Sequence, residues 1–225
     1  MQLNVVDRID NRVKVRNVLI SVSDKEGLKP FVTRMLDIQP GITIFSTGGT
    51  YEAIRSFLGP ADDHLRQVSE YTGQPETQGG LVKTLDFKIY LGLLTETYNP
   101  AHRKDLERTH AVPIDMVVVN LYPFEKTILK SDVTVEKARG NIDIGGPCMI
   151  RAAAKNFIRV ASVVDPADYD VILDEMERFG GSTSIDLRFR LAQKAFRHTA
   201  QYDRAIADYL DGQTIDRVTG CYQLL

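Results

Sequence analysis

Two glycine-rich turns are the segments of this sequence best suited to chemistry on an anion. Residues 46–50 read Ser-Thr-Gly-Gly-Thr after an apolar run, and glycines there let the backbone approach a phosphate closely. A tight turn with a threonine cap is the alternative explanation of the same residues. Residues 141–147 read Asn-Ile-Asp-Ile-Gly-Gly-Pro, where a proline after glycines marks a helix start with unpaired amides. Such amides can stabilise an oxyanion, with Asp143 beside them as a general base or a local cap.

A few single side chains could supply protons or charge near these turns. Lys83 follows a Gly-Gly pair, and Tyr122 comes two residues after Asn120, at the end of an apolar run. Taken alone, they are also typical of a flexible loop and of a strand end stopped by proline. Arg151 and Lys155 stand four residues apart in a helical segment, so their like charges repel unless an anion compensates. That spacing is as typical of a surface helix as of a site.

Lys25 lies in a segment with two explanations. Ser23 and Glu26 have the spacing of a capping box, which predicts that a helix begins here. A lysine at a helix start opposes the helix dipole, and a bound anion would remove that conflict.

The elements that must position these residues alternate between short apolar runs and longer helical segments. Strands are predicted over residues 18–20, 42–45, 116–119 and 159–164. Helices are predicted over residues 26–36, 51–57, 134–139, 147–156, 166–179 and 184–210. The alternation predicts an α/β fold with an open, mostly parallel sheet and flanking helices, with ligands at the carboxyl ends of the strands. We expect one domain, with an α/β core over about residues 14–180 and a strandless helical extension over about 181–225.

The composition bounds the class of protein. Hydrophobic residues make up 43% and charged residues 26% of the 225 residues, as in an ordinary soluble domain. A formal net charge of −2 gives no general electrostatic footprint for nucleic acid or for an anionic membrane. Two cysteines and four scattered histidines predict neither a disulfide framework nor a metal site. We therefore expect a cytoplasmic protein without a metal or cofactor, a nucleic-acid partner or a membrane span.

Six segments, taken in order, resemble the IMP cyclohydrolase domain of the bifunctional purine-biosynthesis enzymes. They are residues 21–25, 46–50, 82–85, 119–124, 141–147 and 151–156. Residues 165–169 and 194–200 extend the similarity to nearly the whole chain. The resemblance implies a methylglyoxal-synthase-like fold and closure of the second purine ring, from the formamido-imidazole-carboxamide ribonucleotide to IMP with loss of water. That chemistry needs no metal and no redox cofactor.

The resemblance also implies roles for particular residues. Lys83, Tyr122 and Lys155 would supply protons or polarise the formyl oxygen, and Asp143 would act as base or orienter at the carboxamide. The amides around Ile144 and Gly145 would form the oxyanion hole. The expected substrate-binding residues are Ser21, Ser23, Lys25, Thr47, Gly48, Gly49, Thr50, Thr84, Asn120, Ile144, Gly145 and Gly146. Lys155 lies about 12 Å along its predicted helix from the start, so it would have to reach the site across the helix face.

The chain departs from the family pattern around the expected catalytic lysine. The family usually reads Arg-Val-Lys-Thr-Leu-His-Pro-Lys-Ile-His where residues 81–90 read Leu-Val-Lys-Thr-Leu-Asp-Phe-Lys-Ile-Tyr. Leu81 removes an expected cation, Asp86 and Tyr90 replace two histidines, and Thr77-Gln78 alters the preceding loop. Either the lost arginine is replaced from elsewhere or the substrate differs.

The resemblance carries expectations about partners as well. The formyl-transferring half of the bifunctional enzymes has no counterpart here, so a separate formyltransferase is expected to supply the ribonucleotide substrate. Family precedent predicts a homodimer. Two other functions stay open: a non-catalytic module that senses a nucleotide or phosphate, and a methylglyoxal-synthase-type phosphate lyase, which would leave residues 120–124 and 141–156 unexplained.

Overall fold

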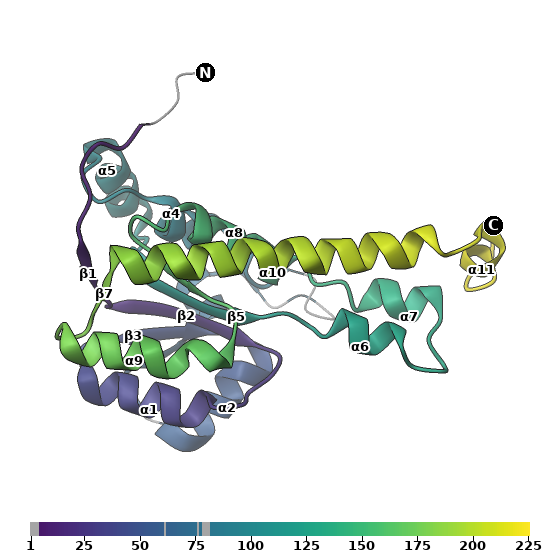
Figure 1. Ribbon diagram of the computed structural model, residues 1–225, viewed down its shortest axis with the longest axis horizontal. Coiled ribbons are helices and arrows are strands. Elements are labelled where there is room, and N and C mark those ends of the chain that lie inside the picture. Colours follow the sequence, from purple (N-terminus) through teal and green to yellow (C-terminus); the bar gives the residue numbers. More distant parts are fainter. Residues whose placement is uncertain (1–4, 61, 76, 78–81) are drawn as a thin grey trace.

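A five-stranded parallel sheet forms the centre of the molecule. The computed structural model describes residues 5–60, 62–75, 77 and 82–225. The strands are β2 (Asn17–Val22), β3 (Thr43–Ser46), β4 (Leu65–Gln67), β5 (Met116–Asn120) and β6 (Ala161–Val163). They lie in the order β4-β3-β2-β5-β6, with every neighbouring pair parallel (Figure 1). The predicted open, parallel α/β sheet is confirmed.

The two central strands are buried on both faces, as their apolar runs predict. Ile20 of β2 pairs with Val118 of β5, and both side chains are almost completely inaccessible to solvent. Alternate residues point to opposite faces of a strand. Ile20 and Val118 accordingly belong to one hydrophobic cluster, while Leu19 and Val117 belong to another on the opposite face.

Helices cover both faces of the sheet. The first cluster is covered by α1 (Leu28–Ile38), α2 (Gly48–Leu58) and α9 (Tyr169–Arg178). The second is covered by α3 (Val68–Thr72), α4 (Phe87–Leu94), α8 (Gly145–Lys155) and most of α10 (Ile185–Asp211). The other described helices are α5 (Pro100–Thr109), α6 (Phe124–Ile128), α7 (Val135–Gly140), η2 (Pro166–Asp168) and α11 (Ile215–Thr219). No helix within the described ranges is long and apolar enough to cross a membrane.

The C-terminal region differs from the strandless extension that the sequence predicts. Strand β7 (Ser182–Ser184) pairs antiparallel with β1 (Arg12–Lys14), so the expectation that no strand follows residue 179 is wrong. A Ser-Thr-Ser segment has no apolar alternation to reveal it, and its pairing comes from a segment about 170 residues away in the chain. The buried guanidinium of Arg188, which donates to the carbonyl oxygens of Asp10 and Thr183, holds the two strands together.

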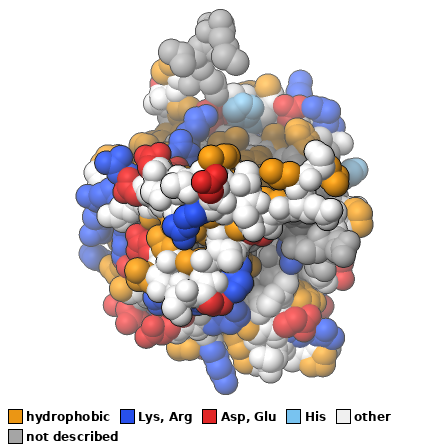
Figure 2. Space-filling view, turned by 90° about the vertical axis from the view of Figure 1, so that its right-hand side faces the viewer, with side chains coloured by type: hydrophobic (Ala, Val, Ile, Leu, Met, Phe, Trp, Pro, Cys, Tyr) orange, Lys and Arg blue, Asp and Glu red, His pale blue; other side chains and the backbone are white. Residues whose placement is uncertain are grey.

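The long helix α10 joins the core to a projecting end. Leu187 and Leu191 lie in the first hydrophobic cluster, and Ala192, Ala195 and Tyr202 lie in the second. Beyond these residues α10 projects past the sheet and runs alongside α6 and α7 towards α11 (Figure 1). Figure 2 views this end, where acidic, basic and hydrophobic side chains are interspersed over the visible surface.

Candidate functional site

Segment 82–86 lies between two glycine-rich helix starts at the carboxyl edge of the sheet. A methyl group on Gly48 would lie 3.3 Å from the Lys83 ammonium nitrogen. A methyl group on Gly145 would lie only 2.7 Å from the Thr84 hydroxyl oxygen, which is too close for two such atoms. Lys83 therefore reaches the start of α2, and its neighbour Thr84 reaches the start of α8. The structure brings together three segments that are far apart in the sequence.

The start of α2 offers uncapped amides next to a cation. Gly48 adopts φ +48°, and Thr47 precedes the helix in an extended conformation without a side-chain capping bond. The first N–H groups of a helix have no partner within the helix, so those of Gly48 and Gly49 suit an anion. Lys83 and Thr47 also line a small hollow here, together with Gln67 and other residues after β4. The predicted threonine cap is absent, because the Thr47 hydroxyl makes no capping bond.

The hydroxyl of Thr50 bonds this turn to strand β2. Its oxygen accepts the N–H of Val22 and its proton goes to the Val22 carbonyl oxygen, both at 3.0 Å. The side chain is buried, as is that of Ser46, which donates to the Ile20 carbonyl oxygen at 2.8 Å. Thr50 was expected to bind the substrate, but in this structure its hydroxyl fixes the turn after β3 to the end of β2.

Asn120 organises the loop that carries Ser23 and Lys25. Its side-chain oxygen accepts the N–H groups of Ser23 at 2.6 Å and Asp24 at 2.9 Å, and its amide nitrogen donates to the Asp24 carbonyl oxygen. Ser21, which also lies at the end of β2, pairs in register with Val119. The amide of Asn120, expected to contact substrate, thus closes the loop after β2.

The predicted capping box is wrong. Helix α1 begins at Leu28, after Gly27 in the left-handed conformation at φ +67°, and no side chain caps it. The N–H of Glu26 instead binds the Asp24 carboxylate at 2.9 Å. Lys25 is exposed three residues before the helix, so the predicted conflict with the helix dipole does not arise. A contact from another strand, through Asn120, replaces the local cap.

Asp143 is held between α8 and α10. Its backbone N–H donates to the Tyr202 hydroxyl oxygen at 2.8 Å, and its carboxylate accepts the N–H of Gly146 at 2.9 Å. Burial raises the pKa of Asp143 above its ordinary value of 3.8, although the N–H groups of Gly146 and Gly145 oppose that shift. A side chain on Gly146 would collide with the Asp143 carboxylate and with Leu121, so this position requires glycine.

The first amides of α8 therefore point at a carboxylate of the chain itself. The amides around Ile144 and Gly145 were expected as oxyanion donors, but in this structure the N–H groups of Gly145 and Gly146 interact with Asp143. Ile144 precedes the helix with its side chain 60% exposed. The Asp143 carboxylate thus binds the amides at the start of α8, as a local cap does, and the same carboxylate is the candidate base.

Tyr122 and Lys155 occupy different places. Tyr122 follows β5 with its side chain 56% exposed, one residue after the Leu121 that contacts the Gly146 position. Lys155 is the last residue of α8 and is exposed, about 15 Å along the helix axis from Gly145. The structure does not bring Lys155 to the other candidates within one chain. Arg151, on the same helix, lies 5.7 Å from the centre of the Phe196 ring of α10.

The positions that depart from the family pattern have structural roles here. Asp86 is buried and caps α4 by accepting the N–H of Lys88 at 2.7 Å. The Tyr90 hydroxyl is buried, and this burial, together with the neighbouring Cys148 thiol, raises its pKa. Thr77 accepts the N–H of Val82 at 3.2 Å. Leu81 and Gln78 lie outside the described residues.

A larger cavity lies at the opposite, amino-terminal edge of the sheet. It has a volume of about 420 Å³, and none of the candidate site residues lines it. Its floor includes the buried ion pair between Arg159 and Asp115, 3.1 Å apart, and Arg16 and Arg103 lie among its walls. Cavity size alone would therefore direct attention away from the glycine-rich turns.

Tyr202 is the residue that sequence reasoning missed. It lies on α10, 59 residues beyond the Asp143 that it contacts. Its position on the apolar face of a long helix is the only signal in the sequence, and that signal also fits an ordinary core residue.

Comparisons with known proteins agree with this fold. The family model of the MGS-like domain matches residues 27–148, and that of the AICARFT/IMPCHase bienzyme matches residues 153–223. The bifunctional purine biosynthesis protein PurH of Ruminiclostridium cellulolyticum is 48% identical over 196 residues. These residues are 87% of this chain but only 37% of PurH. The crystal structure of ForH is similar at a TM-score of 0.71 and 31% identity, over 86% of this chain and 97% of ForH.

Proposed function

We propose that this chain, which belongs to the MGS-like domain family and is an IMP cyclohydrolase-type domain of PurH-like proteins, catalyses closure of the second purine ring. Its substrate would be the formamido-imidazole-carboxamide ribonucleotide, and its products IMP and water. The observation that carries the proposal is the junction of two helix starts at Lys83-Thr84. Among the described residues, the first amides of α2 have no hydrogen-bond partner and suit a phosphate, whereas the start of α8 holds Asp143.

The reaction requires positioning more than reagents. The carboxamide nitrogen attacks the formyl carbon of the same molecule, a C–N bond forms, and the nitrogen loses a proton. The C–O bond of the former formyl group then breaks, the formamido nitrogen loses its proton, and the oxygen leaves as water. Because both reacting groups belong to one ligand, holding them in contact can supply much of the acceleration. The amides of Gly48 and Gly49 and the ammonium group of Lys83 would anchor the phosphate end, since this is where amides and cation converge.

Asp143 is the best-placed base. A carboxylate with a raised pKa accepts protons at neutral pH more readily than an ordinary one. Taking the proton from the carboxamide nitrogen would weaken its interactions with the N–H groups of Gly145 and Gly146, which would then be available to the developing oxyanion. Tyr122, which is exposed just after β5 and next to Leu121, would donate a proton to the departing oxygen. Lys155 receives no step within one chain because of its distance.

The test is direct turnover of the purified chain. Conversion of the formamido-imidazole-carboxamide ribonucleotide is followed by absorbance, and IMP is identified by chromatography. The spontaneous reaction and a Lys83→Ala, Asp143→Ala double variant are the controls, with Lys104→Ala, an exposed lysine on α5, as the matched surface variant. IMP formation well above the first two controls is expected. A wild-type rate equal to the spontaneous rate would refute the proposal.

The occupied amides of α8 favour one other function. Because Asp143 already holds them, the chain could bind a nucleotide through the open start of α2 without catalysis. Calorimetric titration with IMP separates the two: binding without turnover supports a sensing module.

A further inference from the structure

We infer that Tyr202 is a positioning residue for Asp143, which makes the long helix α10 part of the candidate site. The Tyr202 hydroxyl accepts the backbone N–H of Asp143 at 2.8 Å, and the side chain is only 8% exposed. The catalytic meaning of this contact rests on the proposed function, whereas the contact itself does not.

The hydroxyl fixes the part of Asp143 that α8 leaves free. Helix α8 orients the carboxylate through the N–H of Gly146, and Tyr202 orients the backbone through the N–H of Asp143 itself. Without the hydroxyl, that N–H would lie in a partly buried place with no partner, and the segment before α8 would move to satisfy it. The carboxylate would move with it.

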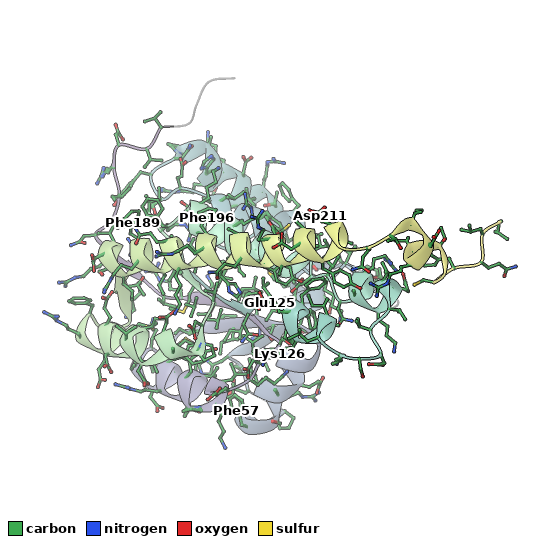
Figure 3. The ribbon with its side chains drawn as sticks, turned by 45° about the vertical axis from the view of Figure 1, so that its right-hand side comes forward. Phe57, Glu125, Lys126, Phe189, Phe196 and Asp211 are labelled. Carbon is green, nitrogen blue, oxygen red and sulfur yellow. The ribbon has the colours of Figure 1, made fainter. Side chains whose placement is uncertain are left out.

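The same tyrosine ring also supports the loop that carries Tyr122. Its centre lies 6.2 Å from that of Phe124, with the two planes at 70°, an edge-to-face arrangement. Phe124 is fully buried and begins α6, two residues after Tyr122. Figure 3 shows α6, marked by Glu125 and Lys126, beneath α10. Tyr202 therefore contacts both segments that carry the candidate acid and base.

Tyr209 provides a matched control on the same helix. Its ring also meets Phe124 edge to face, with centres 5.8 Å apart and planes at 86°. Its hydroxyl, however, is buried without a hydrogen-bond partner among the described residues. Changing either tyrosine to phenylalanine keeps the ring and removes one oxygen atom. Only at Tyr202 does that change remove a bond to Asp143.

The experiment compares Tyr202→Phe with Tyr209→Phe in the full chain. Three quantities are measured: kcat and KM for the formamido-imidazole-carboxamide ribonucleotide, thermal unfolding, and the rate of hydrogen exchange at the Asp143 amide by NMR. For Tyr202→Phe we expect kcat to fall on the order of tenfold, with KM within about twofold, because the base is displaced while the phosphate site is kept. The Asp143 amide exchanges faster in this variant, and Tyr209→Phe matches the wild type in kcat and in this exchange rate.

The outcomes separate the two proposals. Equal kcat values and equal Asp143 exchange rates in both variants would overturn the role of Tyr202. An equal loss of kcat in both, with a parallel loss of thermal stability, would assign Tyr202 to general packing and also overturn it. A wild-type chain without turnover contradicts the proposed function alone, and the exchange rates then decide whether Tyr202 positions Asp143.

Discussion

Polar groups at the two edges of the parallel sheet differ in how many bonds they make within the protein. At the amino edge, the Asp115 carboxylate accepts the N–H groups of Arg16 and Asn17 and pairs with Arg159, whose guanidinium also donates to the carbonyl oxygens of Gly92 and Thr95. These bonds join the beginnings of β2, β5 and β6 to the end of α4. At the carboxyl edge, helix amides are left open or share a single carboxylate.

The polar groups of the amino edge stabilise the fold, whereas those of the carboxyl edge are open to a ligand. Removing one partner of a buried ion pair leaves an uncompensated charge, so the pair at the amino edge is tied to the stability of the fold. The open amides at the start of α2 are not part of such an ion pair, so they can bind a ligand without loss of the fold. Substitutions at the two edges should therefore have different effects on turnover and on stability.

Removal of the carboxyl-edge charges should abolish most of the turnover and leave the fold intact. For Asp143→Ala we expect kcat/KM to fall by about 10²–10⁴-fold, the range for loss of an acid–base group. Lys83→Ala, measured separately, should also lower kcat/KM, mainly through a higher KM, because it removes the cation of the phosphate anchor. Steady-state kinetics and thermal unfolding measure the two quantities. A wild-type rate in both variants would place the chemistry elsewhere.

Removal of the amino-edge carboxylate should lower stability and leave turnover unchanged. Asp115→Ala leaves the Arg159 charge buried and unpaired, so the free energy of unfolding in urea should fall by about 3–5 kcal/mol. Asp174→Ala is the matched control, because its pair with Arg34 is exposed and screened by water, so its loss should change the free energy of unfolding far less. Turnover per folded molecule stays at the wild-type level in both. A specific loss of turnover in a stable Asp115→Ala protein would contradict the contrast between the edges.

A methyl group at the start of α8 should lower both stability and turnover moderately. Gly146→Ala forces an atom between Leu121 and the Asp143 carboxylate, so we expect a loss of about 1–3 kcal/mol in unfolding free energy, as for overpacking, together with slower turnover. Gly140→Ala is the control, because its methyl group would enter open space. Equal stability of the two variants would show that α8 can move away from Asp143.

The pH dependence of turnover should reveal Asp143. Its folded pKa is raised by burial, so the carboxylate takes up its proton at a pH above the ordinary 3.8 as acid is added. A protonated carboxyl cannot act as a base, and the rate should therefore fall as the pH drops through the raised value. The pH–rate profile of Asp143→Asn should lack this acidic limb. Retention of the limb in that variant would assign it to another group.

The smallest effect is expected at Lys155. Because it lies at the far end of α8, Lys155→Ala should change kcat/KM by less than about twofold if one chain forms the whole site. A large loss instead would require Lys155 from another chain, and mixing Lys155→Ala with Lys83→Ala protein would then restore activity. Gel filtration of the same samples shows whether the chain forms the expected homodimer.

Local patterns predicted four strands of the five-stranded sheet and the two turns, because apolar runs and glycines act on their own neighbourhood. The short edge strand β4 was not predicted. Strand β5 and the start of α2 needed no information beyond adjacent residues. Helix α5 went unpredicted although Asn99 caps it and Pro100 opens it, both signals that the sequence displays. That omission was avoidable.

The remaining errors concern contacts between distant segments. Ser23 fits a capping box, but Asn120, 97 residues away, binds the loop instead. The pairing of β7 with β1 and the bond from Asp143 to Tyr202 are likewise invisible in local spacing. Each joins backbone groups to partners that only the folded chain brings near.

A small tilt of helix α10 would displace the residue that bonds to Asp143. Its 27 residues form a rod about 40 Å long, anchored at one end by β7 and by Arg188. Tyr202 lies about 26 Å from that anchor, so a tilt of only about 2° displaces its hydroxyl by roughly 1 Å, enough to break a hydrogen bond. Packing of α10 against α8, β6 and the β1–β7 ribbon therefore sets how precisely the backbone of Asp143 is placed.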